Sequence, residues 1–422
     1  MKKNNQIIGV VGLGYVGLPL AAILSQKYEC IGYDIAADRI QELSKGVDRT
    51  GELTHEEMNN LGRLKFSCDS TDLKHCDFFI ITVPTPVNNE NIPDFGPLES
   101  ASKLIGGLLK KDDIVVYEST VYPGATEEIC VPILERYSGL QAGDDFFYGY
   151  SPERINPGDP LNRVENIIKV TSGCNETVAK VIDDLYASVI VAGTFKAASV
   201  KVAEAAKVIE NAQRDVNIAF MNQISMIFGN LGIDTSDVLD AAATKWNFMK
   251  FSPGLVGGHC IGVDPYYLIK KAVDSGCDPK LLKVSRGINE GVPQYIADRL
   301  IATLGPDVTK LPILMLGATF KENCPDLRNS KVKELYDIFI DQGYEVTVTD
   351  PCASLDELGG LYSNTTVLPK ASYSAIVLAV AHDDFFDKGF LIHEDRVIEG
   401  GVIFDVKSKI KDIRNDITLM KL

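Results

Sequence analysis

The segment IIGVVGLGYVG, residues 7–17, constrains the fold of this 422-residue chain more than any other. An apolar run predicts a buried strand that leads into a G-x-G-x-x-G turn, and LPLAAILSQK (18–27) has the spacing of a helix. Gly12 permits the tight turn, Gly14 lets the backbone approach a pyrophosphate, and Gly17 allows close packing of the helix. The pattern therefore predicts a dinucleotide-binding turn, with a purely structural glycine turn as the alternative.

An acidic residue in the next strand supports the dinucleotide. Asp34 ends the predicted strand CIGYD (30–34), 22 residues after Gly12, at the spacing of a ribose-binding acid. Its charge would repel a 2′-phosphate, which favours NAD over NADP. Arg39 lies close enough in sequence to accommodate such a phosphate, but we expect it to cover the adenine face instead.

The alternation of strands and helices continues through the first part of the chain. Further β-rich runs, separated by helical or turn-forming sequence, are FFIITVP (78–84), DIVVYEST (113–120) and FFYGYSPE (146–153). This pattern is typical of a parallel sheet covered on both faces.

The last part of the chain repeats the plan. The predicted elements are strands at 311–318, 344–351, 374–382 and 401–406 and a helix at 331–343. Asp350 closes the second of these strands, as Asp34 does in the first part. A glycine fingerprint is missing, so this second nucleotide-binding type of fold need not bind a dinucleotide.

A helical region lies between the two. No proline occurs from Leu161 to Ser252, and roughly 196–230 reads as one helix, which at about 35 residues would be near 50 Å long. We predict an α/β protein with two Rossmann-like domains joined by a long-helix central α domain: 1–197 binds NAD, 198–305 is helical, and 306–422 is the second Rossmann-like domain. The length of the helix also predicts a homodimer formed through it.

Composition narrows the partners. The net charge of −16 argues against nucleic acid and anionic membrane surfaces as partners. No run of about 18 apolar residues predicts a membrane span. Nine scattered cysteines without Cys-x-x-Cys, and five histidines without metal-ligand spacing, predict a reduced cytoplasmic chain with neither a disulfide framework nor a metal site.

Several polar residues are candidates for the site. Thr85 in VPTP and Thr120 in STVYPG follow predicted strands and are candidate hydroxyls beside the cofactor, with turn or capping chemistry as the alternative. Lys207, Asn211 and Arg214 share one face of the long helix, at i, i+4 and i+7. This stripe is either solvated or a substrate face, where an ammonium and an amide would hold an oxyanion and a guanidinium a phosphate or sugar oxygen.

Cys260 stands among glycines in GLVGGHCIGVDPYYL (254–268), with Asp264 four residues later. The alternative to a structural thiol is a nucleophile. A thiolate beside an NAD site can capture an aldehyde, yield a second hydride and leave a thioester that water hydrolyses, which makes a four-electron oxidation. Asp264 would assist proton transfer or position the water.

Seven motifs occur together in one order along the chain: GLGYVGLP, VPTP, ESTVYPG, YSPERINPGD, AEAAKVIENAQRD, GLVGGHCIGVDPYYL and LGATFKENCPDLRNSK. Over essentially its whole length the chain resembles the nucleotide-sugar dehydrogenases of the UDP-glucose/GDP-mannose type. In GGHCIGVDPYYL and SPERINPGD it is most similar to the branch that oxidises C6 of UDP-N-acetylglucosamine or UDP-N-acetylgalactosamine. The resemblance implies a UDP-sugar substrate held by the last domain and a role in the biosynthesis of surface polysaccharides such as capsule or O-antigen.

The resemblance also implies a role for individual residues. Catalytic roles fall to Cys260 as nucleophile, Lys207 as proton donor or acceptor, Asn211 in the oxyanion site, Asp264 as general base or water-orienting group, Glu153 at the reaction centre and Thr120 beside cofactor or water. The implied cofactor contacts are Gly12, Gly14, Tyr15, Val16, Gly17, Asp34, Arg39, Thr85, Thr120 and Arg328. The implied substrate contacts are Arg154, Ile155, Lys207, Asn211, Arg214, Gly257, Phe320 and Lys321.

Two departures count against glucose as the sugar. UDP-glucose dehydrogenases have a glutamate where this chain has Pro157, and a lysine where it has Val263. UDP-glucose and UDP-N-acetylmannosamine remain alternative substrates. A two-electron β-hydroxyacid dehydrogenase, which needs no cysteine, and a sensor that binds NAD and UDP-sugar without chemistry are alternative functions.

Overall fold

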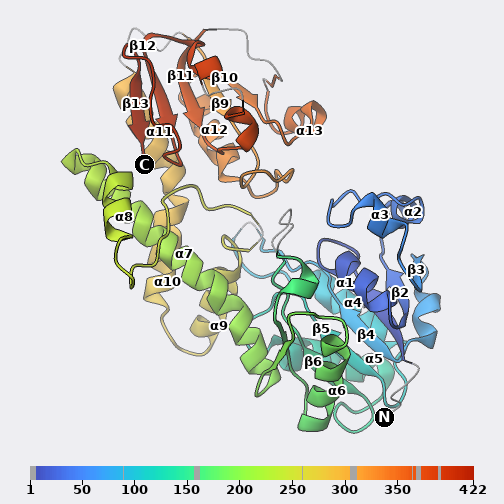
Figure 1. Ribbon diagram of the computed structural model, residues 1–422. Coiled ribbons are helices and arrows are strands. Elements are labelled where there is room, and N and C mark those ends of the chain that lie inside the picture. Colours follow the sequence, from blue (N-terminus) through green and yellow to red (C-terminus); the bar gives the residue numbers. More distant parts are fainter. Residues whose placement is uncertain are drawn as a thin grey trace. The chain divides into compact units, whose positions relative to one another are not determined.

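The computed structural model describes residues 6–88, 90–155, 162–258, 260–304, 311–363, 365–366, 372–387 and 391–422. Pro157 and His259 lie outside the described residues. The chain forms two compact units, Met1–Glu210 with Tyr266–Cys277, and Asn211–Pro265 with Asp278–Leu422. Each is coloured along the sequence in Figure 1 and is described here by itself.

The first unit is built on a six-stranded parallel sheet of order β3-β2-β1-β4-β5-β6. Its strands are β1 (Ile7–Val11), β2 (Glu29–Tyr33), β3 (Leu64–Ser67), β4 (Phe78–Ile81), β5 (Ile114–Tyr117) and β6 (Phe147–Tyr150). The chain order reverses between β1 and β4, which is where doubly wound sheets bind ligands at their carboxyl ends. A separate parallel pair joins β7 (Lys169–Thr171) to β8 (Thr194–Lys196).

Helices cover both faces of this sheet (Figure 1). One face packs against α1 (Gly17–Ser25), α2 (Ala37–Ser44), α3 (His55–Met58) and α6 (Glu176–Ala187). The other packs against η1 (Ser70–His75), α4 (Gly96–Gly106), α5 (Val131–Ser138) and the start of α7 (Val200–Leu231). Two short turns, η2 (Thr126–Cys130) and η3 (Val164–Asn166), complete the unit. The central strands β4 and β5 are apolar throughout because both of their faces are buried, whereas β3 contains polar and partly exposed residues.

The second unit contains a five-stranded parallel sheet of order β10-β9-β11-β12-β13. Its strands are β9 (Ile313–Leu316), β10 (Val346–Thr349), β11 (Tyr373–Leu378), β12 (Val397–Asp405) and β13 (Thr418–Lys421). One core lies between this sheet and α11 (Val292–Thr303), α12 (Lys331–Asp341) and α13 (Leu355–Gly359). A smaller core on the other face includes Phe385 of η4 (Asp383–Phe385), and α14 (Leu391–Glu394) precedes β12.

The remaining helices are long or link the sheets. Helix α7 has 32 residues, close to the predicted range of 196–230. It is followed by α8 (Thr235–Ala242), α9 (Asp264–Asp274) and α10 (Lys280–Glu290). The fold class, two Rossmann-like sheets with a long helical region between them, is confirmed, whereas the boundaries near 197 and 305 remain a prediction.

Candidate active site

The glycine turn after β1 is held by the acid that ends β2. Leu13 N donates to Asp34 Oδ2 at 2.8 Å, and Ala36 N donates to Asp34 Oδ1 at 2.9 Å. Gly12 has φ +97°, a left-handed conformation that suits glycine, and a Cβ on Gly14 would meet nothing within 4 Å. The turn thus offers exposed backbone with open space beside it, as the approach of a pyrophosphate requires.

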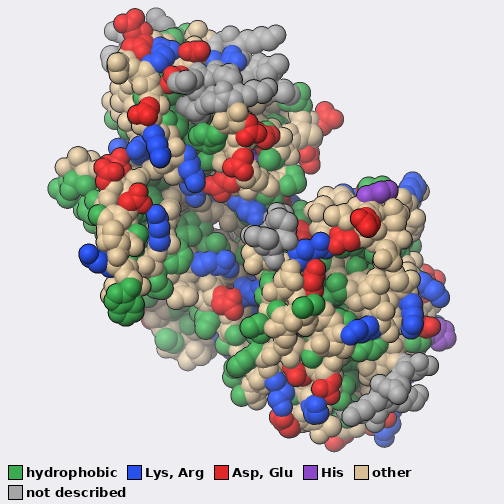
Figure 2. All heavy atoms as spheres, viewed as in Figure 1, with side chains coloured by type: hydrophobic (Ala, Val, Ile, Leu, Met, Phe, Trp, Pro, Cys, Tyr) green, Lys and Arg blue, Asp and Glu red, His purple; other side chains and the backbone are tan. Residues whose placement is uncertain are grey.

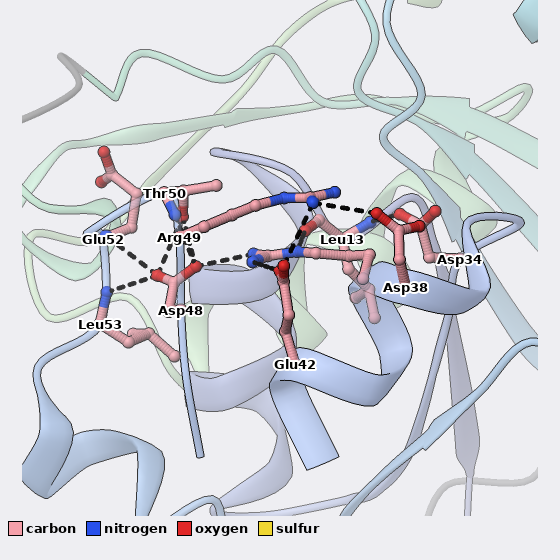
Figure 3. Close-up of polar contacts among 10 residues, drawn as sticks. Leu13, Asp34, Asp38, Glu42, Asp48, Arg49, Thr50, Glu52 and Leu53 are labelled. Atoms are coloured by element: carbon pink, nitrogen blue, oxygen red, sulfur yellow. Dashed lines mark hydrogen bonds and ion pairs between the residues drawn. The ribbon is translucent and has the colours of Figure 1, made fainter. Parts of the chain in front are cut away.

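Two arginines near Asp34 already have partners, and Figure 3 labels one of them, Arg49, with its partners Asp38 and Glu42. Arg39 is 3% exposed, and its guanidinium donates to Leu13 O at 3.0 Å and to Asp48 Oδ1 at 2.7 Å. Arg49 pairs with Asp38 at 3.0 Å and with Glu42 at 3.3 Å. The carboxylates in this region therefore disfavour a 2′-phosphate. Arg39 is placed to support the glycine turn. Its predicted contact with adenine remains a prediction.

The predicted hydroxyls lie in loops at the carboxyl ends of β4 and β5. Thr85 and Thr120 are both half-buried, and Thr85 O accepts from Tyr267 Oη at 2.8 Å. Glu204 of α7 braces the loop after Thr120, because its carboxylate accepts from Gly124 N at 2.5 Å and Thr126 N at 2.9 Å. Burial raises the pKa of Glu204 to about 7.

A buried charge cluster lies beside the predicted reaction-centre glutamate. Lys169 Nζ donates to Glu153 Oε2 and to Glu118 Oε2, each at 2.7 Å. Glu118 also accepts from Tyr186 Oη. Burial raises the pKa of Glu118, and the neighbouring Glu153 adds to the effect. Burial opposes the charged form of Lys169, but Glu118 and Glu153 together raise its pKa.

The three predicted side chains of α7 differ in exposure. Lys207 is 6% exposed and Asn211 is fully buried, whereas Arg214 is exposed. Arg154, a predicted substrate contact, pairs with Glu210 and donates to Lys207 O. The stripe is therefore only partly solvated, and Arg154 ties the chain beyond β6 to the turn of α7 that carries Lys207.

Asp264 is the first residue of α9, and Cys260 lies in the turn that precedes this helix. Cys260 is exposed, and its backbone carbonyl accepts from Asp264 N at 2.8 Å. The Asp264 carboxylate is buried and accepts from Asn211 Nδ2 at 2.5 Å, while Arg214 donates to Asn211 Oδ1. An amide nitrogen carries two hydrogens, so this bond leaves one of them for an oxyanion. The sequence spacing of Cys260 and Asp264 thus becomes a spatial unit with Asn211.

The loop before Cys260 is held by hydrogen bonds and packing contacts to other residues of the second unit. Gly258 N donates to Asn329 O at 3.1 Å, and Gly258 has φ +84° with the Phe320 ring 2.7 Å from where a Cβ would stand. A Cβ on Gly257 would lie 2.5 Å from Asn329 O, so this predicted substrate contact is also a packing contact. The side chain of Asn222 in α7 forms two hydrogen bonds with the backbone of Gly254. Its Oδ1 accepts from Gly254 N at 2.8 Å, and its Nδ2 donates to Gly254 O at 3.1 Å.

The loop that carries Phe320 and Lys321 follows β9. Asp350 accepts from Ala318 N at 2.6 Å and Thr319 N at 3.1 Å, which parallels the bond of Asp34 to Leu13. His382 Nδ1 accepts from Asn323 N at 3.0 Å, so its Nε2 carries the hydrogen that reaches Asp350 at 3.0 Å.

Two further features surround this loop. Asp350, Cys352 and His382 have potential ligand atoms within 4.8 Å of one another, but backbone N–H groups already occupy the carboxylate. Arg328 forms a bidentate pair with Asp326, at 3.0 and 2.7 Å, and its contact with the cofactor remains a prediction.

The other implied contacts have simple locations. Tyr15 and Val16 are half-buried in the turn before α1, and Gly17 is buried as its first residue. Ile155 is half-buried and packs against the core that contains α1 and α6. Their contacts with ligands, like those of Gly257 and Lys321, remain predictions.

Sequence reasoning missed Lys169, Glu118 and Asn222. The first two carried a signal, because each is a charged residue in an otherwise apolar β-rich run, NIIKVT and VVYEST. A charge buried in such a run requires a partner. Asn222 carried none, since one asparagine in a long helix is ordinary.

The turn, the sheet order and Asp34 define a dinucleotide-dependent class of protein. Residues 6–190 match the NAD binding domain of the UDP-glucose/GDP-mannose dehydrogenase family, 201–291 its central domain, and 314–412 its UDP binding domain. The chain belongs to the UDP-glucose/GDP-mannose dehydrogenase family and is an NAD-dependent oxidoreductase.

Individual relatives agree over nearly the full length. The chain is 48% identical to a UDP-N-acetyl-D-glucosamine 6-dehydrogenase of Pseudomonas aeruginosa, over 98% of this chain and 99% of that one. It is 46% identical to a protein of the same name from Salmonella typhi, over 98% of each chain. It is also similar in structure to a UDP-D-ManNAc dehydrogenase from Pyrococcus horikoshii, with a TM-score of 0.87, 29% identity and 99% of both chains covered. Among the described residues, no helix has the length and apolarity needed to cross a membrane.

Proposed function

We propose that the chain oxidises C6 of a UDP-2-acetamido-2-deoxyhexose, UDP-N-acetylglucosamine or UDP-N-acetylgalactosamine, to the uronic acid through a covalent intermediate on Cys260. The observation that carries the proposal is the exposed Cys260 thiol four residues before a buried carboxylate, Asp264, that is hydrogen-bonded to Asn211. The names of the relatives from Pseudomonas aeruginosa and Salmonella typhi support the acetamido sugar.

Bound NAD would supply the hydride acceptor, and the open turn at Gly14 with the carboxylate of Asp34 fits it. Lys207 would take the proton of the C6 hydroxyl. The Cys260 sulfur then adds to the aldehyde carbon, a C–S bond forms, and the carbonyl oxygen takes a proton while Asn211 stabilises it.

The second oxidation converts this thiohemiacetal to a thioester. Water, positioned by Asp264 or Glu153, adds to the thioester carbon, the C–S bond breaks, and the thiol is regenerated. One alcohol, one water and two NAD⁺ thus give one carboxylate, two NADH and three protons.

A panel of UDP-sugars tests the proposal, with NADH followed by absorbance and the product identified by mass. We expect two NADH per UDP-N-acetylhexosamine and lower kcat/KM for UDP-glucose and UDP-N-acetylmannosamine. Cys260→Ala should abolish acid formation and Cys260→Ser should be slow or stalled, because an alkoxide is far less available than a thiolate. Cys277→Ser, a change at another exposed thiol, is the matched control.

Three outcomes would contradict the proposal. One NADH per substrate, or normal turnover by Cys260→Ala, would indicate the two-electron β-hydroxyacid dehydrogenase. Binding of NAD and UDP-sugar without any NADH would indicate a sensor. Preference for UDP-glucose or UDP-N-acetylmannosamine would keep the chemistry but change the sugar.

We also propose a homodimer through α7. Five exposed apolar side chains of this helix, at spacings of 7, 11, 7 and 4, lie on one face: Val202, Ile209, Phe220, Ile227 and Leu231. Hydrophobic side chains also gather on the surface near α8 (Figure 2). Trp246, four residues after the end of α8, is 97% exposed. Ile227→Glu should shift the mass measured by light scattering from dimer to monomer. We further propose that the enzyme is cytoplasmic and supplies uronic acid for the synthesis of surface polysaccharide.

A further inference from the structure

We propose that Asn222 is a positioning residue, which holds the loop before Cys260 so that the sulfur meets the aldehyde formed in the first oxidation. This inference rests on the proposed function for the chemistry of the thiol. The hold itself lies within the second unit, because residues 211–265 and 278–422 belong to that unit together.

The side-chain amide of Asn222 is fully used in holding the loop. Its Oδ1 accepts from Gly254 N at 2.8 Å, and its Nδ2 donates to Gly254 O at 3.1 Å and to Asn289 Oδ1 at 2.8 Å. An amide nitrogen has two hydrogens, so both are committed. Asn222 and Gly254 are buried, so water does not reach these groups. Loss of the amide would leave the backbone of Gly254 without these bonds, and the loop would have to move to satisfy it.

Asn289 of α10 is held in turn by a charged residue of α7. Its Nδ2 donates to Asp215 Oδ1 at 2.7 Å and to Asp215 O at 3.0 Å, and Arg286 Nη1 donates to the same Oδ1 at 2.5 Å. All three side chains are buried, where a carboxylate is costly unless it is paired. Because the amide nitrogen of Asn289 faces Asp215, its Oδ1 is left to accept from Asn222. The pairing of Asp215 with Arg286 therefore sets the orientation of both amides.

The same network reaches the other end of the loop. Arg286 also pairs with Glu290 one turn along α10, and Glu290 pairs with Lys331, the first residue of α12. Two residues before Lys331, the carbonyl of Asn329 accepts from Gly258 N at 3.1 Å. The loop is therefore hydrogen-bonded at its first and its last glycine, and side chains of α7 and α10 connect the two attachments.

Helix α7 holds the chain on both sides of Cys260. Asn222 is hydrogen-bonded to the loop before it, and Asn211 donates to Asp264, whose backbone N–H donates to the carbonyl of Cys260 at 2.8 Å. The two asparagines are eleven positions apart, which is three helical turns, so they lie on one face of α7 about 16 Å apart along its axis. The sulfur thus keeps a fixed place relative to Asn211, the proposed oxyanion donor. Such precision matters because a misplacement of about 1 Å between reacting groups can cost about 100-fold in rate.

Two variants of the full chain test the hold against a matched control. Asn222→Ala removes all three hydrogen bonds of the amide. Asn222→Asp has nearly the same shape and keeps the acceptor for Gly254 N, but it sets a carboxylate oxygen against Gly254 O and Asn289 Oδ1, which are both acceptors. Asn217→Ala is the control, because Asn217 is half-buried on the same helix and its Nδ2 has no hydrogen-bond partner among the described residues.

The first readout is the balance between the two oxidations. With Cys260 displaced, the aldehyde still forms but is captured less often, so methoxyamine should trap at least about tenfold more aldehyde per NADH in both variants than in the wild type. The kcat for acid formation should fall about 10- to 100-fold. Kd for NADH should stay unchanged, since the glycine turn lies in the first unit. A purely structural role would lower both oxidations equally and would trap no additional aldehyde.

The second readout needs no substrate. Hydrogen–deuterium exchange of peptides that contain residues 254–258 should be at least about threefold faster in both variants, because the bonds at the two ends of the loop belong to one network. Asn217→Ala should exchange like the wild type in the same peptides.

The outcomes distinguish this inference from the function on which it rests. One NADH per sugar in the wild type would overturn the proposed function, and with it the role of Asn222. Two NADH in the wild type, with kcat and trapped aldehyde in both variants equal to those of Asn217→Ala, would overturn the inference alone, as would unchanged exchange of the loop. If Asn222→Ala does not fold, Asn222→Asp decides: more trapped aldehyde supports the inference, and no increase overturns it.

Discussion

Replacement of Asp34 by alanine should weaken NAD binding without creating a preference for NADP. The side chain accepts from Leu13 N at 2.8 Å and from Ala36 N at 2.9 Å. Asp34→Ala removes these bonds, the expected ribose contact and one negative charge. The arginines that would attract a 2′-phosphate stay engaged, Arg39 with Asp48 and Arg49 with Glu42.

The magnitude follows from the loss of a hydrogen bond to a charged group, which is worth about 1.5–3 kcal/mol. At 1.4 kcal/mol for each factor of ten, Kd for NAD should rise about 10- to 150-fold. Kd for NADP should fall by a smaller factor than the factor by which Kd for NAD rises, because Asp38, Glu42 and Asp48 keep the region acidic (Figure 3).

The assay is a fluorescence titration with NADH and NADPH, supported by kcat/KM for both oxidised forms. Asp34→Asn is the matched control, since it keeps one acceptor oxygen and should lie between the wild type and Asp34→Ala. A Tm close to that of the wild type would show that the turn still folds. An Asp34→Ala enzyme that used NADP as well as the wild type uses NAD would refute the reasoning.

Two further predictions concern stability and the thiol loop. The raised pKa of Glu204, about 7 against an ordinary 4.5, means that the folded chain binds the proton more tightly than the unfolded chain. The stability that this group contributes is present below pH 4.5 and is lost as pH rises to 7, by about 3 kcal/mol. Glu204→Gln should remove this pH dependence of the free energy of unfolding, measured by urea denaturation at pH 5, 6 and 7. An unchanged pH dependence in the variant would contradict the prediction. Gly258→Ala forces a left-handed alanine against the Phe320 ring and should lower the free energy of unfolding by ~1–2 kcal/mol. Gly258→Ala should also lower kcat, because it displaces Cys260. Gly276→Ala is the control: φ is also positive at this residue, but a Cβ there meets nothing within 4 Å. Equal kcat for both variants would exclude a special role for the loop before Cys260.

The success of the sequence analysis depended on how local each signal was. Strands β1, β2, β4 and β5 are short apolar runs with turns at their ends, and α7 is one uninterrupted run without proline, so pattern alone located them. Strands β3 and β13, each of four residues with polar members, were not predicted. They become strands because they pair with β2 and β12, which pattern within a segment does not encode.

The site divides in the same way. The sequence by itself determined three features of the site: the glycine turn with Asp34, the helical stripe and the Cys260–Asp264 spacing. The residues of each feature lie within a short stretch of the chain, so their spacing alone indicates the chemistry that they can perform together. Tertiary structure alone decided that Asn211 bonds Asp264 across 53 positions and that Lys169 joins Glu118 to Glu153 across 51 and 16. Packing brings such groups together, and burial then compels them to pair, because a charge removed from water is stable only beside its partner.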